Sequence, residues 1–215
     1  MAAQPAAPEV ATLTEEGLQH VRDHMMLPEE SLSGLGRELG RARYTVSEAS
    51  LTTGSKVDPV AVKVMLDKDN TRFEVAVSMW ASHHCKHVCR THGAVVRDDK
   101  LLMVMERCKG SLGDVLERGE LLTQGELARA AQDICAAVAE LHACGIVHCD
   151  IKPANSFVRK DGTVVLGSFG SAKVGRLRGC VSKWRCMYAS HGARHSEFLY
   201  VKLRGRRSMF SLHNH

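Results

Sequence analysis

The sequence predicts an α+β fold, in which strand-forming segments come before a long helix and a short hairpin follows it. Val60–Leu66 (VAVKVML) and Leu101–Met105 (LLMVM) are apolar runs of strand length. Thr123–Cys144 instead repeats its apolar residues at helical spacing. We therefore expect a β-rich part followed by a helical part.

Length and composition are those of an ordinary globular protein. The chain has 215 residues, of which 44% are hydrophobic and 25% charged, which suits one buried core or two small lobes. Its eight cysteines come without a signal-peptide pattern at the N-terminus, so we expect reduced thiols and a cytoplasmic location. No stretch approaches the ~18 uninterrupted apolar residues of a membrane span, and we expect none.

The first 33 residues are expected to form a flexible leader. Residues 1–12 are rich in alanine and proline and offer little apolar surface to bury. Within the leader, Leu13–Met26 can form a short helix. The folded part is therefore predicted to begin at residue 34.

The helix Thr123–Cys144 has clear ends as well as an apolar face. Thr123 and Glu126 are spaced as a capping box, and Gly145 supplies the stop. The apolar positions at helical spacing are Leu127, Ala130, Ile134, Val138 and Leu141. These features predict an amphipathic helix that leads into the segment starting at Ile146.

A β-hairpin is expected further along the chain, with strands at Phe157–Arg159 and Thr163–Leu166. Lys160-Asp161-Gly162 connects them, and the glycine can adopt the positive φ that such turns need. Between the helix and this hairpin lies a polar loop, which carries the strongest functional signal of the sequence.

That loop contains Asp150, Lys152 and Asn155, three residue types that together suit phosphoryl transfer. A carboxylate can accept or orient a hydroxyl proton, an ammonium can neutralise charge on the moving phosphate, and an amide oxygen can hold magnesium. Pro153 stiffens the loop and keeps Lys152 out of any helix.

The run HCDIKPAN, residues 148–155, resembles the catalytic loop of eukaryotic protein kinases, in the Lys-Pro form typical of serine/threonine kinases. The resemblance continues in family order over roughly residues 36–173. It implies a two-lobed protein-kinase-like fold, with a small β-rich N-lobe at 34–105 and an incomplete helical C-lobe at 106–173. It also implies that the chain binds ATP and Mg²⁺ and transfers the γ-phosphate to serine or threonine hydroxyls of a protein partner.

The resemblance implies a role for each candidate site residue. Asp150 would be the catalytic base, Lys152 the phosphate-neutralising cation and Asn155 the metal ligand. Lys63 would contact the nucleotide phosphates and be held by Glu74 on the next helix. Taken alone, a lysine such as Lys63 favours an edge-strand charge that faces water, and a solvated helix carboxylate is the alternative for Glu74. The other cofactor-binding positions are Gly40 and Val46 in the glycine-rich loop, Ala61 in the lysine strand, and Glu106 and Cys108 in the adenine hinge.

Three departures from the family pattern bear on activity. In the glycine-rich loop Gly40 matches the first glycine, but Ala42 stands at the second and the third is absent. Cys149 replaces the arginine that would pair with a phosphorylated activation loop. Ser168 stands where the family has its magnesium-chelating aspartate, so one full charge is lost at the metal. The alternative function is therefore a pseudokinase or truncated kinase that acts as a non-catalytic binding module.

Two other segments suggest different functions. Residues 83–92 hold four histidines and two cysteines, but not in zinc-ligand spacing, so we expect a turn packed at the lobe interface. Residues 174–215 are expected to be a poorly ordered basic tail, because residues 173–215 carry 10 basic and 1 acidic side chains. The tail lacks the aromatic spacing of a stacking platform, so a nucleic-acid partner is not expected.

Overall fold

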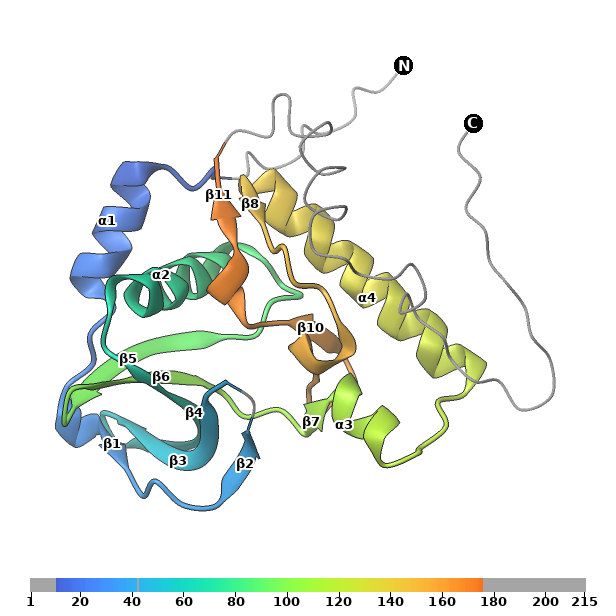
Figure 1. Ribbon diagram of the computed structural model, residues 1–215, viewed down its shortest axis with the longest axis horizontal. Coiled ribbons are helices and arrows are strands. Elements are labelled where there is room, and N and C mark those ends of the chain that lie inside the picture. Colours follow the sequence, from blue (N-terminus) through green and yellow to red (C-terminus); the bar gives the residue numbers. More distant parts are fainter. Residues whose placement is uncertain (1–10, 42, 176–215) are drawn as a thin grey trace. The chain divides into compact units, whose positions relative to one another are not determined.

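The computed structural model of the chain describes residues 11–41 and 43–175 (Figure 1). Its N-terminal half is built on a six-stranded antiparallel sheet with the order β1-β3-β4-β6-β5, in which β2 also pairs with β3. The strands are β1 (Leu32–Ser33), β2 (Glu38–Arg41), β3 (Thr45–Thr53), β4 (Lys56–Leu66), β5 (Thr91–Arg97) and β6 (Lys100–Glu106).

β4 is a central strand of this sheet because it pairs with both β3 and β6. Side chains alternate between the two faces of a strand, and both faces of β4 pack in apolar clusters. Val60 and Val62 join one apolar cluster, whereas Met65 lies in the larger core cluster on the other face. Helix α2 (Asp69–His84) supplies Val75, Ala76 and further buried residues to the same larger cluster.

The second half of the structure contains two helices, two small sheets and two 3-10 turns (Figure 1). The helices are α3 (Leu112–Glu117) and α4 (Gln124–Ala143). One sheet has the order β10-β9-β7, and β11 pairs with β8 in the other. The strands are β7 (Gly110–Ser111), β8 (Ile146–Val147), β9 (Ser156–Val158), β10 (Val164–Leu166) and β11 (Lys173–Val174), and the turns are Pro153–Asn155 and Phe169–Ser171.

The predicted helix and hairpin of this half are both confirmed. Thr123 caps α4 by accepting the Glu126 N–H, and Gly145 follows the helix with φ of 72°. The hairpin forms between β9 and β10, and Gly162 takes a φ of 89° in its turn. Capping and turn signals predict local structure well because the residues that interact lie only a few positions apart in the sequence.

Residues 13–33 are not a flexible leader as expected, although the short helix expected within Leu13–Met26 is present. This segment forms α1 (Glu15–His24), a 3-10 turn at Glu29–Ser31 and β1. Leu13, Leu18 and Met25 are buried in the core cluster that α2 also joins. The Met25 carbonyl accepts the Ala94 N–H at 2.8 Å, which ties the segment to β5. Residues 1–10 and the predicted basic tail beyond Gly175 lie outside the described residues.

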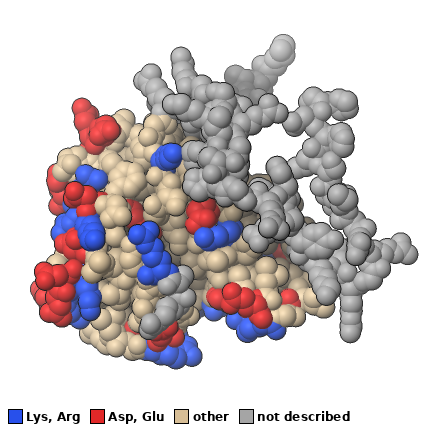
Figure 2. All heavy atoms as spheres, in the orientation of Figure 1, with Lys and Arg blue, Asp and Glu red and all other residues tan. Residues whose placement is uncertain are grey.

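The α+β fold with a β-rich lobe ahead of a helical part is thus confirmed. Within residues 11–41 and 43–175, no helix combines the length and apolar character needed to cross a bilayer. On the face drawn in Figure 2, basic and acidic side chains are interspersed over the described part of the chain.

Met25 and Met26 allow a direct test that the N-terminal segment belongs to the fold. Met25 is 1% exposed and Met26 is 38% exposed. We expect Met25→Ala to lower the free energy of unfolding by ~2–5 kcal/mol because it opens a cavity in the core. Met26→Ala should change it by less than ~0.5 kcal/mol. Urea unfolding measures both changes. Equally small changes for the two variants would contradict the burial of Met25 and favour a flexible leader.

Candidate active site

Lys63 and Glu74 form a buried ion pair between β4 and α2. The distance from Lys63 Nζ to Glu74 Oε1 is 2.6 Å, and the two side chains are 14% and 4% exposed. Charges are buried at this depth only when they are paired, because an unpaired one would lose its hydration without compensation. Lys63 is therefore not an edge-strand charge, and Glu74 is not a solvated carboxylate.

The β2–β3 hairpin lies next to this ion pair. Gly40 pairs with Val46 across the hairpin, and Val46 in turn pairs with Lys63 on β4. The Tyr44 ring centroid lies 5.1 Å from Lys63 Nζ, within cation–π range. Tyr44 is a site residue that our sequence reasoning missed; the signal was an aromatic side chain next to the missing glycines.

The predicted catalytic loop brings Asp150, Lys152 and Asn155 together. Asn155 Nδ2 donates to both the Asp150 carbonyl and Asp150 Oδ2, each at 2.8 Å. Lys152 Nζ lies 2.8 Å from the same Oδ2, in a pair that is about half exposed. Pro153 opens the 3-10 turn that ends at Asn155, as its fixed φ favours. The loop therefore presents its carboxylate and ammonium to solvent on a braced backbone.

His148 is the buried support of this loop. Its Nε2 lies 2.8 Å from the Gly167 carbonyl, and its Nδ1 accepts the Asp150 N–H at 3.3 Å. Both contacts are satisfied by the neutral ring that carries its proton on Nε2. Burial lowers the pKa of His148, and the hydrogen bond to Gly167 opposes this only in part. The ring also packs on Phe169, with centroids 4.9 Å apart.

Ser168 and Phe169 join the loop to the ion pair. Ser168 has a left-handed backbone with φ of 66°, and Phe169 is buried in the core. A Cβ added at Gly170 would lie 3.0 Å from Glu74 Oε2, so the backbone approaches the ion pair closely here. Only glycine permits that approach without displacing the carboxylate.

The side chains of Asn155 and Ser168, which stand at the metal-binding positions of the family, do not fit a magnesium ion. Asn155 offers one amide oxygen, and Ser168 offers only a neutral hydroxyl. Magnesium in nucleotide sites is held by one or two carboxylates together with substrate phosphates. The set is therefore one negative charge short of the aspartate-containing family site.

Glu106 and Cys108 lie at the end of β6, where the adenine hinge was predicted. The Glu106 side chain is held by Arg159, whose Nη2 lies 2.8 Å from Oε1, and by the Arg90 N–H at 2.7 Å. Its carboxylate thus fixes the strand end. The Cys108 backbone N–H and carbonyl have no hydrogen-bond partner among the described residues. Ala61 on β4, also predicted to bind the cofactor, pairs with Met105 on β6, next to the Val60–Glu106 pair.

The His83–His92 segment packs at the junction of α2 and α4, as expected. His87 Nδ1 lies 2.9 Å from Glu140 Oε1, and the His87 N–H donates to Oε2 of the same residue at 3.0 Å. Cys85 Sγ and Cys144 Sγ, both buried, are 3.7 Å apart. These contacts pair His87 and Cys85 with residues of α4 and its C-cap.

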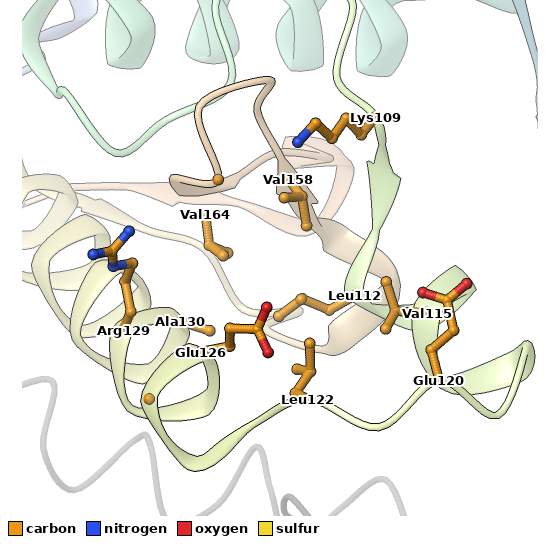
Figure 3. Close-up of a pocket in the computed structure, with 12 residues that line it drawn as sticks. Lys109, Leu112, Val115, Glu120, Leu122, Glu126, Arg129, Ala130, Val158 and Val164 are labelled. Atoms are coloured by element: carbon orange, nitrogen blue, oxygen red, sulfur yellow. The ribbon is translucent and has the colours of Figure 1, made fainter.

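A separate cavity of about 510 Å³ lies between α3, α4 and the β9–β10 hairpin (Figure 3). Its lining includes Leu112, Val115, Leu122, Ala130, Val158 and Val164, with Glu126 and Arg129 beside them. None of the predicted site residues lines it. The cavity is therefore distinct from the site around Asp150 and Lys63.

The lowered pKa of His148 predicts that the stability of the fold depends on pH. In the unfolded chain an imidazole takes up a proton near its ordinary pKa of 6.5, whereas in the folded protein His148 does so only at lower pH. Stability should therefore fall as pH drops below about 6.5, by at most ~1.4 kcal/mol per pH unit from this group.

The measurement is urea unfolding at pH ~7.5 and ~5.5. His148→Gln keeps a hydrogen-bond donor but cannot titrate, so it should lose less stability on acidification than the wild type. His83→Gln removes an exposed imidazole and should follow the wild type. Identical pH dependence in the wild type and His148→Gln would contradict the assignment.

The family comparison agrees with this geometry. The model of the Protein kinase domain family matches residues 35–188. The E3 ubiquitin-protein ligase KEG of Arabidopsis thaliana is 32% identical over 136 residues, which cover 63% of this chain and 8% of the relative. Maternal embryonic leucine zipper kinase of Xenopus tropicalis is 34% identical over 125 residues, covering 56% and 19%.

A third relative is serine/threonine-protein kinase Nek1 of Mus musculus, with 30% identity over 123 residues, which cover 55% of this chain and 10% of the relative. The chain thus spans at most 19% of the length of these three relatives. The matched range contains the Lys63–Glu74 ion pair and the Asp150 loop. Because the family model matches more than half of the sequence, this chain belongs to the protein kinase family.

Proposed function

We propose that the chain binds ATP as a protein kinase domain and transfers the γ-phosphate to serine or threonine hydroxyls of a protein partner. The observation that carries this proposal is the buried Lys63–Glu74 pair. An ammonium has three N–H donors, and Glu74 is its only hydrogen-bond acceptor among the described residues. Donors therefore remain to bind phosphate oxygens next to the β2–β3 hairpin.

The hinge supports the adenine end of the same site. The Cys108 backbone offers one donor and one acceptor that no described residue uses, which suits the edge of a base. Ala61 and Val46 bring small apolar side chains from the neighbouring strands. Arg159 and the Arg90 N–H fix the Glu106 side chain, so the strand end that leads to Cys108 is held in place.

The reaction itself is assigned to the exposed loop. Asp150 Oδ2 is occupied by Asn155 and Lys152, which leaves Oδ1 to accept or orient a substrate hydroxyl proton. Lys152 lies 2.8 Å from that carboxylate and can neutralise charge on the phosphate as it moves. Because the pair is about half exposed, a side chain of a protein substrate can reach it.

A second candidate function is nucleotide binding without turnover. Ser168 favours it, because the lost charge belongs to the metal-binding position and not to the nucleotide anchor. If that charge contributes several kcal/mol in the transition state, the rate falls by orders of magnitude at ~1.4 kcal/mol per decade. The identity of the protein substrate is likewise proposed, and a cytoplasmic location stays a prediction from the sequence.

Nucleotide binding is tested by thermal unfolding with and without ATP, each with and without magnesium. At an ATP concentration of ~100 Kd we expect the wild-type Tm to rise by about 5–10 °C. Lys63→Ala should abolish the rise, and Lys56→Ala, an exposed lysine on the same strand, should keep it. Absence of a rise in the wild type would refute the proposed nucleotide site.

The Ser168→Asp variant tests what limits phosphoryl transfer. Aspartate tolerates the left-handed backbone at this position better than most residues, so the exchange should not disturb the fold. We expect the magnesium-dependent transfer rate to rise by ~10²-fold or more, since a full charge is restored at the metal position.

Two further variants complete this experiment. Ser171→Asp adds the same charge at an exposed position of the same turn and should leave the rate unchanged. Asp150→Asn in the Ser168→Asp background should remove transfer while nucleotide binding persists. A rate that does not rise in Ser168→Asp would mean that the missing charge is not what limits the site.

A further inference from the structure

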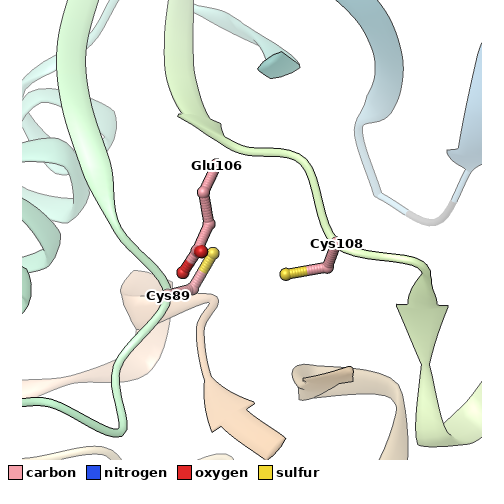
Figure 4. A group of neighbouring side chains, drawn as sticks. All are labelled: Cys89, Glu106 and Cys108. Carbon is pink, nitrogen blue, oxygen red and sulfur yellow. The ribbon is translucent and has the colours of Figure 1, made fainter. Parts of the chain in front are cut away.

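Two cysteines converge beside the hinge. The Sγ atoms of Cys89 and Cys108 and a carboxylate oxygen of Glu106 all lie within 4.8 Å of one another (Figure 4). Figure 4 shows the Cys108 side chain directed from the hinge toward Cys89. Cys89 is 6% exposed, and Cys108 is more accessible. The proposed kinase function uses neither thiol.

The backbones that carry the two thiols are held on either side. β5 and β6 form an antiparallel hairpin, and the Glu106 N–H donates to the Arg90 carbonyl at 2.9 Å at its open end. The Cys89 N–H donates to the Leu166 carbonyl at 2.8 Å. The Lys109 N–H donates to the Val158 carbonyl at 2.8 Å. The sulfurs therefore face each other across the open end of a hairpin, on fixed backbones.

Zinc suits this cluster less well than a bond between the sulfurs. Both Glu106 oxygens accept hydrogen bonds from Arg159, and Oε1 also accepts the Arg90 N–H. A metal ion at the thiols would lie close to the Arg159 guanidinium, whose charge repels it. Two cysteines and a carboxylate committed elsewhere also fall short of the four ligands of a structural zinc site.

We propose that Cys89 and Cys108 are a reversible dithiol–disulfide site, which a small-molecule disulfide such as glutathione disulfide oxidises. The Cys108 thiolate attacks one sulfur of glutathione disulfide, giving a mixed disulfide and one glutathione thiolate. The Cys89 thiolate then attacks Cys108 Sγ, forms the Cys89–Cys108 bond and releases the second glutathione. Two protein thiols lose two electrons and two protons, and one glutathione disulfide becomes two glutathione molecules.

The order of attack follows from accessibility. Cys108 meets the oxidant first, because Cys89 is almost fully covered. A hydrogen bond with Cys108, burial and the nearby Glu106 raise the pKa of Cys89, while Arg159 opposes the shift. Once Cys108 carries glutathione, proximity makes the second attack effectively unimolecular. The Cys85 and Cys144 sulfurs lie 3.7 Å apart, but both residues are buried and neither can meet the oxidant.

The test uses the purified full chain, reduced, freed of metal by a chelator and then equilibrated in a glutathione redox buffer. Acid quenching, alkylation in denaturant and trypsin digestion should yield residues 87–90 linked to residues 108–109. We expect this linkage to form at least ~10-fold faster than a Cys85–Cys144 linkage, because the latter pair cannot reach the oxidant. Excess dithiothreitol should reverse it.

Two variants and one metal measurement decide the outcome. Cys108→Ser should abolish the linkage, and Cys135→Ser, an exposed cysteine on α4, should leave it unchanged. Recovery of Cys108 mainly as a glutathione adduct, or bonded to another cysteine, would overturn the proposal. So would one equivalent of zinc that the chain binds in titration and loses in Cys89→Ser. Both readouts are independent of ATP binding and of phosphoryl transfer.

Discussion

The Lys63–Glu74 ion pair fixes the arrangement of the site, because neither charge can stay buried without the other. The pair requires that the inward face of β4 and the buried face of α2 meet in one register, which Val75 and Ala76 hold by packing in the core. A rotation of α2 that separated the charges would leave both without hydration, at a cost of ~3–5 kcal/mol. Gly170 then places the turn after Ser168 against the same carboxylate.

The Asp150 loop depends on a second, uncharged constraint. His148 is kept neutral by burial, and in that state it links the Gly167 carbonyl to the Asp150 N–H. Phe169 packs on the ring from the following turn. Lys63 and Asp150 are therefore positioned by different interactions. An ion pair with Glu74 positions Lys63, and the buried, neutral imidazole of His148 positions the loop that carries Asp150.

The sequence predicted those parts of the structure whose causes are local. The cap at Thr123 and the stop at Gly145 lie within one turn of the helix that they end, so α4 was predicted almost to the residue. The leader was misjudged because the burial of Met25 depends on β5, about 70 residues away. Likewise Glu106 was expected only as a hinge position, since nothing nearby reveals that Arg159 holds its carboxylate.

Helix α1 bears on how the boundaries of this domain should be drawn. It packs on α2, where a Cβ at Gly17 would lie 3.1 Å from the Trp80 ring, and Arg22 lies over Phe73. The family match begins at residue 35, after this helix has ended. A recombinant fragment trimmed to the matched range would therefore lack a brace on the helix that carries Glu74. For this chain, the unit that folds begins upstream of the unit that similarity recognises.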